Sequence, residues 1–221
     1  MKKEKMTSVE LVIFDLDGTI IDSLDDLEAA TNYMLSELGR GNLSKYQVRE
    51  LIGQGARRLV ERAVPDASPE EIELGLTLFL AFNEEHIADK TKLYPGVVDT
   101  LKVLRRQGRQ LVVVSNKNVS LCRKVLYTLH LEEFFTSLLG ADSTLFRKPS
   151  PEPVLKLLGE YGVKPANAVI IGDSINDIAA GKASGIVTVG CTYGYGNPAE
   201  LKDADFLIDA VAELLELPIF R

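Results

Sequence analysis

The 221-residue sequence has few of the residues that many catalytic and metal centres use. It contains no tryptophan, two histidines and two cysteines. Cys122 and Cys191 lie far apart in the chain, and we expect two free thiols in a reducing cytoplasm, with a disulfide as the alternative. His86 and His130 lack the spacing of a metal site or a catalytic triad. Chemistry in this protein is therefore expected to depend mainly on carboxylates.

Long hydrophobic runs and an excess of positive charge are also absent. No apolar run approaches the ~20 residues that a membrane-spanning helix needs. The basic residues near the N-terminus are not followed by a hydrophobic segment, so we expect no signal peptide. A net charge of −7 argues against a general nucleic-acid binder, which normally carries a basic face. These features predict a cytoplasmic protein without membrane or nucleic-acid partners.

Short runs rich in valine and isoleucine predict the strands. They cover residues 9–15, 110–115, 168–173, 186–190 and, more weakly, 204–209. These runs are apolar without alternation, which is typical of strands covered on both faces by helices. Amphipathic stretches separate them, at residues 97–107, 119–129 and 151–161. Alternating strands and helices predict an α/β fold with a Rossmann-like parallel sheet.

Residues 22–90 contain no such run and show only helical periodicity. Apolar residues recur at helical spacing in three stretches, 24–38, 51–64 and 72–82. We therefore predict an all-helical cap domain at residues 22–90, inserted after the first strand. The predicted core domain consists of residues 1–21 and 91–221. Linkers near residues 21–23 and 91–95 would join the two.

Polar residues follow the predicted strand regions at their carboxyl ends, where open α/β sheets bind ligands. These residues are Asp15, Asp17, Ser115, Asn116, Lys148, Asp173 and, one helical turn further on, Asp177. Because residues two apart in an extended chain point the same way, Asp15 and Asp17 are expected to face one site while Leu16 enters the core. Gly18 permits a tight turn in which backbone N–H groups approach an anion.

The carboxylates in this set predict a metal site. Asp15, Asp17 and Asp173 would repel one another unless a cation lay among them. An all-oxygen set that leaves room for water and substrate suits Mg²⁺ better than zinc. Lys148 and Ser115 add a positive charge and a hydroxyl donor. Together these groups are the equipment of phosphoryl transfer, in which a carboxylate attacks phosphorus without needing a base.

Four segments resemble the ordered motifs of the haloacid dehalogenase superfamily of phosphatases. They are DLDGT at 15–19, VVVSN at 112–116, RKPSP at 147–151 and GDSIND at 172–177. The resemblance extends over essentially the whole chain. The helical block resembles the cap of the subgroup that includes phosphoglycolate phosphatase, and so do LIGQGARRLVERA at 51–63 and VTVGCTYGYGNPAEL at 187–201.

The resemblance implies a Mg²⁺-dependent phosphomonoester hydrolase that works through an aspartyl-phosphate intermediate. Asp15 would be the nucleophile. Asp17 would be the general acid for the leaving group and then the base for the attacking water. Ser115 and Lys148 would hold the transferring phosphoryl group.

The resemblance also implies a ligand set for Mg²⁺. The side chains of Asp15 and Asp173 and the backbone carbonyl of Asp17 would bind the ion, and Asp177 would support it from behind. Gln54 and Gly55 lie in a loop of the predicted cap that is expected to reach the site. The residues expected to contact substrate are Gly18, Thr19, Gln54, Gly55 and Asn116.

The expected substrate is a small phosphorylated metabolite, with 2-phosphoglycolate as the leading candidate. A β-phosphoglucomutase-like phosphotransferase is an alternative, although Gly53 is followed by Gln54-Gly55-Ala56 where that group has Ser-Arg. A pyrophosphatase is another, although its usual Gly-Pro-Pro in the cap loop is absent. Asp17 argues against a dehalogenase, and the complete set of catalytic positions argues against an inactive binding module. We expect a monomer or a homodimer.

Overall fold

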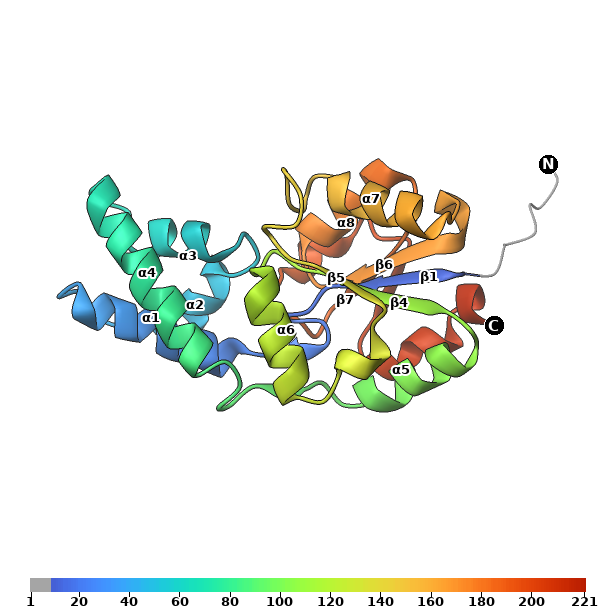
Figure 1. Cartoon of the computed structure of the whole chain (residues 1–221), viewed down its shortest axis with the longest axis horizontal. Coiled ribbons are helices and arrows are strands. Elements are labelled where there is room, and N and C mark those ends of the chain that lie inside the picture. Colours follow the sequence, from blue (N-terminus) through green and yellow to red (C-terminus); the bar gives the residue numbers. More distant parts are fainter. Residues whose placement is uncertain (1–8) are drawn as a thin grey trace.

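A six-stranded sheet forms the centre of the computed structural model, which describes residues 9–221 (Figure 1). All strands are parallel, in the order β5-β4-β1-β6-β7-β8. Their bounds are β1 Leu11–Phe14, β4 Gln110–Val114, β5 Ser137–Leu139, β6 Ala168–Gly172, β7 Val187–Cys191 and β8 Phe206–Ile208. The predicted α/β fold with a Rossmann-like parallel sheet is confirmed.

Helices cover both faces of this sheet because alternate residues of a strand point to opposite sides. Val12 and Phe14 of β1 enter a cluster with apolar residues of α5 and α6, whereas Leu11 and Ile13 enter a second cluster with residues of α7 and α8. These helices are α5 Val97–Arg106, α6 Val119–Thr128, α7 Glu152–Tyr161 and α8 Ile175–Ser184. Short 3₁₀ helices complete this part, at Glu132–Phe134, Pro165–Asn167, Pro198–Leu201, Val211–Glu216 and Pro218–Phe220.

Four helices lie together beyond the carboxyl ends of the strands (Figure 1). They are α1 Leu24–Glu37, α2 Lys45–Leu51, α3 Ala56–Ala63 and α4 Pro69–Glu85. Their apolar faces form a hydrophobic cluster of their own, which includes Met34, Val60 and Phe79. Serine residues cap the N-termini of α2 and α4. Ser44 forms a capping box with Gln47, and the Ser68 hydroxyl accepts the N–H of Glu71.

The helical periodicity over residues 51–64 does not correspond to one helix. α2 ends at Leu51 and α3 begins at Ala56, with a turn at residues 52–55 between them. Gly53 and Gly55 adopt φ values of +104° and +80° in this turn, a region that favours glycine. The two glycines interrupt the helix even though the apolar spacing continues on either side.

The two expected linkers pair with each other. β2 Ile21–Asp22 and β3 Lys92–Leu93 form a two-stranded antiparallel sheet in which Ile21 is opposite Leu93. The chain therefore leaves the main sheet and returns to it through adjacent strands. Strands of two residues show no periodicity, which is why the sequence indicated only linkers there.

Other expectations concern thiols and membranes. Cys122 and Cys191 are both buried and free, as expected. None of the helices within residues 9–221 has the length and apolar character required to cross a bilayer.

Candidate active site

The register of the sheet brings three strand ends to one edge. Phe14 of β1 is paired with Val113 of β4 on one side and with Ile171 of β6 on the other. Polar residues begin immediately after these strands, at Asp15, Ser115 and Asp173. Parallel strands in matching register thus place distant parts of the sequence side by side.

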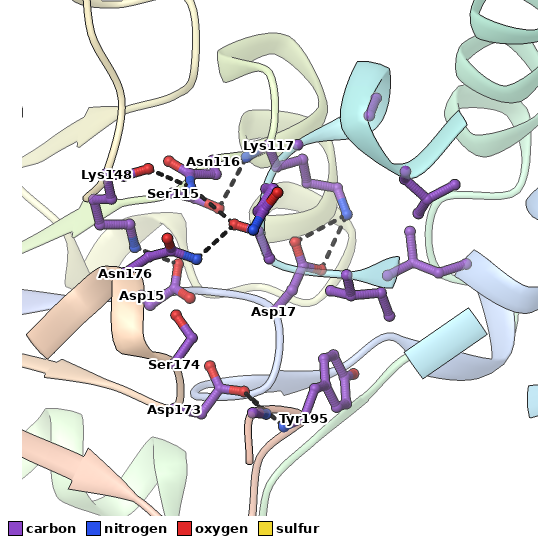
Figure 2. A pocket seen from close by; sticks show the side chains of 18 of the residues that line it. Asp15, Asp17, Ser115, Asn116, Lys117, Lys148, Asp173, Ser174, Asn176 and Tyr195 are labelled. Atoms are coloured by element: carbon purple, nitrogen blue, oxygen red, sulfur yellow. Dashed lines mark hydrogen bonds and ion pairs between the residues drawn. The ribbon is translucent and has the colours of Figure 1, made fainter. Parts of the chain in front are cut away.

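A cavity of about 280 Å³ opens at this edge, between the sheet and the helices α1–α4 (Figure 2). The predicted site residues that line it are Asp15, Asp17, Gln54, Gly55, Ser115, Asn116, Lys148 and Asp173. Gly18, Thr19 and Asp177 do not line it. The structure therefore brings eight of the predicted residues to one cavity and places three directly behind its wall.

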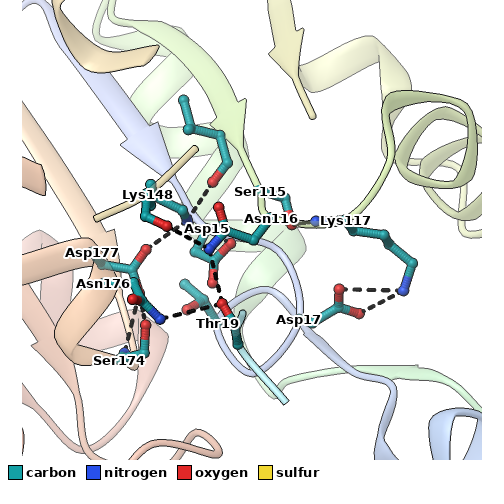
Figure 3. Close-up of polar contacts among 12 residues, drawn as sticks. Asp15, Asp17, Thr19, Ser115, Asn116, Lys117, Lys148, Ser174, Asn176 and Asp177 are labelled. Carbon is teal, nitrogen blue, oxygen red and sulfur yellow. Dashed lines mark hydrogen bonds and ion pairs between the residues drawn. The ribbon is translucent and has the colours of Figure 1, made fainter. Parts of the chain in front are cut away.

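Three buried carboxylates form a candidate metal centre. Asp15, Asp173 and Asp177 each offer one oxygen, and these oxygens all lie within 4.8 Å of one another. The Asp17 side chain is not part of this cluster and points toward Lys117 instead (Figure 3). The third carboxylate of the cluster is Asp177, with 0% of its surface exposed.

Lys148 lies against two of these carboxylates. Its Nζ is 2.9 Å from Asp15 Oδ1 and 2.6 Å from Asp177 Oδ1, and it donates to the Val114 carbonyl at 2.6 Å. Burial lowers the pKa of Lys148, but the Asp15 and Asp177 carboxylates outweigh burial and raise it overall. Lys148 therefore remains charged beside Asp15.

The pKa values of the cluster indicate that it is short of positive charge. Burial raises the pKa of Asp15 to about 8, with Asp177 and Asp173 adding to the rise and Lys148 opposing it. Burial, followed by Asp177, raises the pKa of Asp173 to about 6. A divalent cation would favour the ionised carboxylates, and an all-oxygen donor set fits such an ion.

Asp173 is held in place by the chain around it. Its Oδ2 accepts the backbone N–H groups of Tyr195 at 2.6 Å and Gly196 at 3.2 Å, and its Oδ1 accepts the Thr19 hydroxyl at 3.3 Å. Gly18 has φ +86°, and a Cβ at Gly18 would lie 2.3 Å from Asp173 Oδ2. Gly18 and Thr19, which we expected at the substrate, thus contact Asp173.

Asp17 pairs with a lysine that the sequence analysis did not single out. Lys117 Nζ lies 3.0 Å and 3.2 Å from the two carboxylate oxygens of Asp17 (Figure 3). The Ser23 hydroxyl also donates to Asp17 Oδ1. Lys117 directly follows the second motif, and this position was the one indication in the sequence that Lys117 lies at the site. Its partner is defined only by the fold.

Asn116 joins the core to the turn at residues 52–55. Its Nδ2 donates to the carbonyls of Gly53 and Lys148, each at 2.9 Å, and Asn176 Nδ2 donates to the same Gly53 carbonyl at 3.2 Å. The Ser115 hydroxyl accepts the N–H of Lys117 at 3.2 Å. These contacts seat the glycine turn over the strand ends.

Arg49 of α2 makes a second connection of this kind. Its guanidinium donates to the carbonyls of Gly194 at 2.7 Å and Tyr195 at 3.0 Å. Neither Arg49 nor Asn176 was predicted as a site residue, because no motif includes Arg49 and Asn176 was given no role within the motif at 172–177. The loop that receives Arg49 lies within the segment 187–201 noted in the sequence, but no contact was predicted for it.

Comparisons with known proteins agree with this geometry. A family model for haloacid dehalogenase-like hydrolases matches residues 12–191. Phosphoglycolate phosphatase 1 of Pseudomonas aeruginosa (strain PAO1) is 39% identical over 214 residues, covering 93% of this chain and 78% of that protein. The phosphoglycolate phosphatase of Chromobacterium violaceum is 36% identical over 214 residues, covering 95% of this chain and 96% of that protein.

A solved structure agrees with the fold over nearly the full length. The crystal structure of a predicted phosphoglycolate phosphatase from Haemophilus somnus 129pt is similar with a TM-score of 0.92 at 33% identity, covering 96% of this chain and 99% of that one. The resemblance inferred from the four motifs is thereby confirmed. With the family model covering most of the chain, this protein belongs to the haloacid dehalogenase-like hydrolases.

Proposed function

We propose that the protein is a Mg²⁺-dependent phosphomonoester hydrolase that acts on a small phosphorylated metabolite, with 2-phosphoglycolate as the first substrate to test. The single observation that carries this proposal is the buried cluster of Asp15, Asp173 and Asp177 with Lys148 against it, in and behind the wall of a metabolite-sized cavity. The names of the relatives support the choice of substrate. We further propose a cytoplasmic enzyme that is a monomer or a homodimer.

Mg²⁺ would be held by the side chains of Asp15 and Asp173 and by the backbone carbonyl of Asp17. Asp177 would act from behind, because its Oδ1 accepts Lys148 and its Oδ2 accepts the backbone N–H and hydroxyl of Ser174. When bound, the ion would neutralise the carboxylates and polarise the phosphoryl oxygens. Lys148 would neutralise further charge on the phosphoryl side.

The chemistry would proceed in two steps on the side chains of this protein. The Asp15 carboxylate attacks phosphorus, the ester P–O bond breaks, and Asp17 donates a proton to the departing oxygen. Asp17 then takes a proton from a water molecule that attacks the aspartyl-phosphate, which releases phosphate and restores Asp15. The Ser115 hydroxyl would donate to a phosphoryl oxygen during both steps.

Residues 22–90 would act as a cap domain on a core made of residues 1–21 and 91–221. Closure of the cap over the cavity would exclude water during the first transfer. Support comes from the turn at residues 52–55, whose Gly53 carbonyl accepts hydrogen bonds from the core, and from Arg49. Gln54 and Gly55 would then face the substrate.

Hydrolysis of 2-phosphoglycolate tests this function. We expect wild-type activity to disappear with EDTA and to return with Mg²⁺. Asp15→Asn has the same shape and is expected to fold, to lose on the order of 10³-fold or more in kcat and to carry no phosphate after a rapid quench. Turnover without metal would contradict the ligand assignment. A near-parental rate for Asp15→Asn would show that Asp15 is not the nucleophile.

A further inference from the structure

Lys117 is a second cation in the cavity, and the phosphoryl site does not account for it. Its side chain is only 9% exposed, it lines the same cavity as Asp15, and its Nζ contacts both oxygens of Asp17. Its backbone is anchored on both sides: its N–H donates to the Ser115 hydroxyl and its carbonyl accepts the N–H of Ala141. The ammonium group is thus held at a defined place beside Asp17.

The ammonium group of Lys117 has donor capacity to spare. It carries three N–H groups, and the two oxygens of Asp17 are its only hydrogen-bonding partners within residues 9–221. Lys148 differs, because Asp15, Asp177 and the Val114 carbonyl use all three of its donors. Of these two lysines, Lys117 is therefore the one with an uncommitted N–H.

The other cations that line the cavity are directed elsewhere. Arg49 donates to the carbonyls of Gly194 and Tyr195, and Arg62 donates to the Glu50 carbonyl at 2.6 Å. Neither contacts Asp17. Lys117 is therefore the cation at the leaving-group side of the cavity in the described part of the chain.

The position of Asp17 defines which part of a substrate Lys117 meets. In the proposed function, Asp17 hydrogen-bonds the ester oxygen to which it gives a proton. In an ester of a 2-hydroxy acid, the carboxylate is joined to the carbon that bears this oxygen. An ammonium group about 3 Å from the oxygens of Asp17 then lies within hydrogen-bonding reach of that carboxylate.

We propose that Lys117 is a specificity-determining residue that selects phosphate esters whose leaving group carries a carboxylate on the carbon bearing the ester oxygen. This inference rests on the proposed function and narrows its substrate class to phosphorylated 2-hydroxy acids. The third N–H of Lys117 donates to the substrate carboxylate, while the other two continue to orient Asp17.

Two matched substrates test the inference on the full-length protein with Mg²⁺. One is 2-phosphoglycolate, and the other is 2-hydroxyethyl phosphate, in which a neutral CH₂OH replaces the carboxylate. Lys117→Met keeps most of the aliphatic stem and removes the charge, and Lys117→Arg keeps the charge. Lys102→Met, at an exposed position of α5, is the control. The measurement is kcat/KM for both esters with each variant.

We expect the wild-type protein to favour 2-phosphoglycolate by about 10- to 100-fold, the range of one hydrogen bond between charged groups. Lys117→Met is expected to remove this preference, because its loss on 2-phosphoglycolate exceeds its loss on 2-hydroxyethyl phosphate by the same factor. Lys117→Arg is expected to restore part of the preference, and Lys102→Met to leave it unchanged.

The possible failures are distinguishable. If Lys117→Met lowers kcat/KM equally for both esters, Lys117 only positions Asp17 and the inference is wrong. If the wild-type protein hydrolyses both esters equally well, the inference is wrong while the phosphatase function stands. If it hydrolyses neither, the proposed function itself fails. Should Lys117→Met not fold, Lys117→Gln and the wild-type preference decide the same question.

Discussion

At the scale of single residues, the site depends on small groups that allow polar atoms to approach one another. Gly18 lies so close to Asp173 that any Cβ would displace the carboxylate. Gly194 is confined in the same way, because its Cβ would lie 2.2 Å from that of Asp173. The Asp173 carboxylate can therefore occupy its position only because residues 18 and 194 have no side chain.

Gly18→Ala tests this close approach. Gly108→Ala is its matched control, because Gly108 has a similar φ of +79° but nothing within 4 Å of an added Cβ. Both variants carry the cost of a positive φ, of about 1 kcal/mol. We expect Gly18→Ala to lose a further 1–3 kcal/mol or so in urea unfolding and to bind Mg²⁺ about 10-fold more weakly. Equal losses in the two variants would contradict the clash.

Asn83 has little exposed surface, and its side-chain amide lies in the cavity wall without a hydrogen-bonding partner in the described part of the chain. It lies on α4, is 2% exposed, and shares the cavity wall with Leu27, Leu59 and Phe79. Asn83→Leu has a similar shape and removes an unpaired polar group, so we expect it to raise the free energy of unfolding by about 1 kcal/mol.

The contrasting variant is Asn32→Leu. The Asn32 amide accepts the N–H of Leu43 at 2.8 Å and donates to its carbonyl at 2.9 Å. Its removal is expected to lower the free energy of unfolding by about 1–3 kcal/mol. Chemical denaturation measures both variants, and a loss of stability in Asn83→Leu would contradict the unpaired state of Asn83.

At the scale of elements, α2 and the turn that follows it connect the four-helix group to the sheet. The Gly53 carbonyl in the turn accepts hydrogen bonds from the side-chain amides of Asn116 and Asn176. Arg49 on α2 donates to two carbonyls of the loop whose backbone N–H groups also hold Asp173. The same short segment therefore lines the cavity and contacts the loop that supports Asp173.

Arg49→Met is expected to favour the open cap. Removal of two hydrogen bonds from a charged donor should raise KM for 2-phosphoglycolate about 10-fold. It should also speed tryptic cleavage at Lys90, beside the return strand β3, or at Lys92 within that strand. Arg58→Met is the control, because Arg58 pairs with Glu61 on the surface of α3 and its side chain is 60% exposed. Equal effects of the two substitutions would exclude a connecting role for Arg49.

At the scale of the whole molecule, the fold buries several like charges at one place. Asp15 and Asp173 bind protons more tightly in the folded protein than in the unfolded chain, since their pKa values rise from 3.8 to about 8 and about 6. At a pH between the unfolded pKa of 3.8 and these folded pKa values, the folded state holds protons that the unfolded chain has released. The stability of the metal-free protein must then fall as pH rises from about 4 towards 8.

This direction predicts how the Tm depends on pH and on Mg²⁺. In EDTA we expect the Tm to fall between pH 5 and pH 8. Mg²⁺ at about 100 times its Kd should raise the Tm by roughly 5–10 °C at pH 8 and by less at pH 5. Asp15→Asn should flatten the pH dependence in EDTA. A metal-free Tm that rises from pH 5 to pH 8 would contradict the assigned direction.

The sequence by itself determined the sheet and the approximate place of the site. Apolar runs such as 168–173 need no partner to be recognised as strands covered on both faces, and parallel strands must end at a common edge. The position of Asp15, Ser115 and Asp173 at that edge follows directly. The four motifs added the family, because their order along the chain is itself a sequence property.

Only the tertiary structure decided which side chains touch. The Asp17 carboxylate lies outside the buried cluster because it hydrogen-bonds Ser23 and Lys117, whereas the Asp177 carboxylate lies within the cluster. The partners of Arg49 lie 145 and 146 residues further along the chain. Local periodicity carries no information about such pairs, because side-chain direction and long-range packing arise only when the strands and helices assemble.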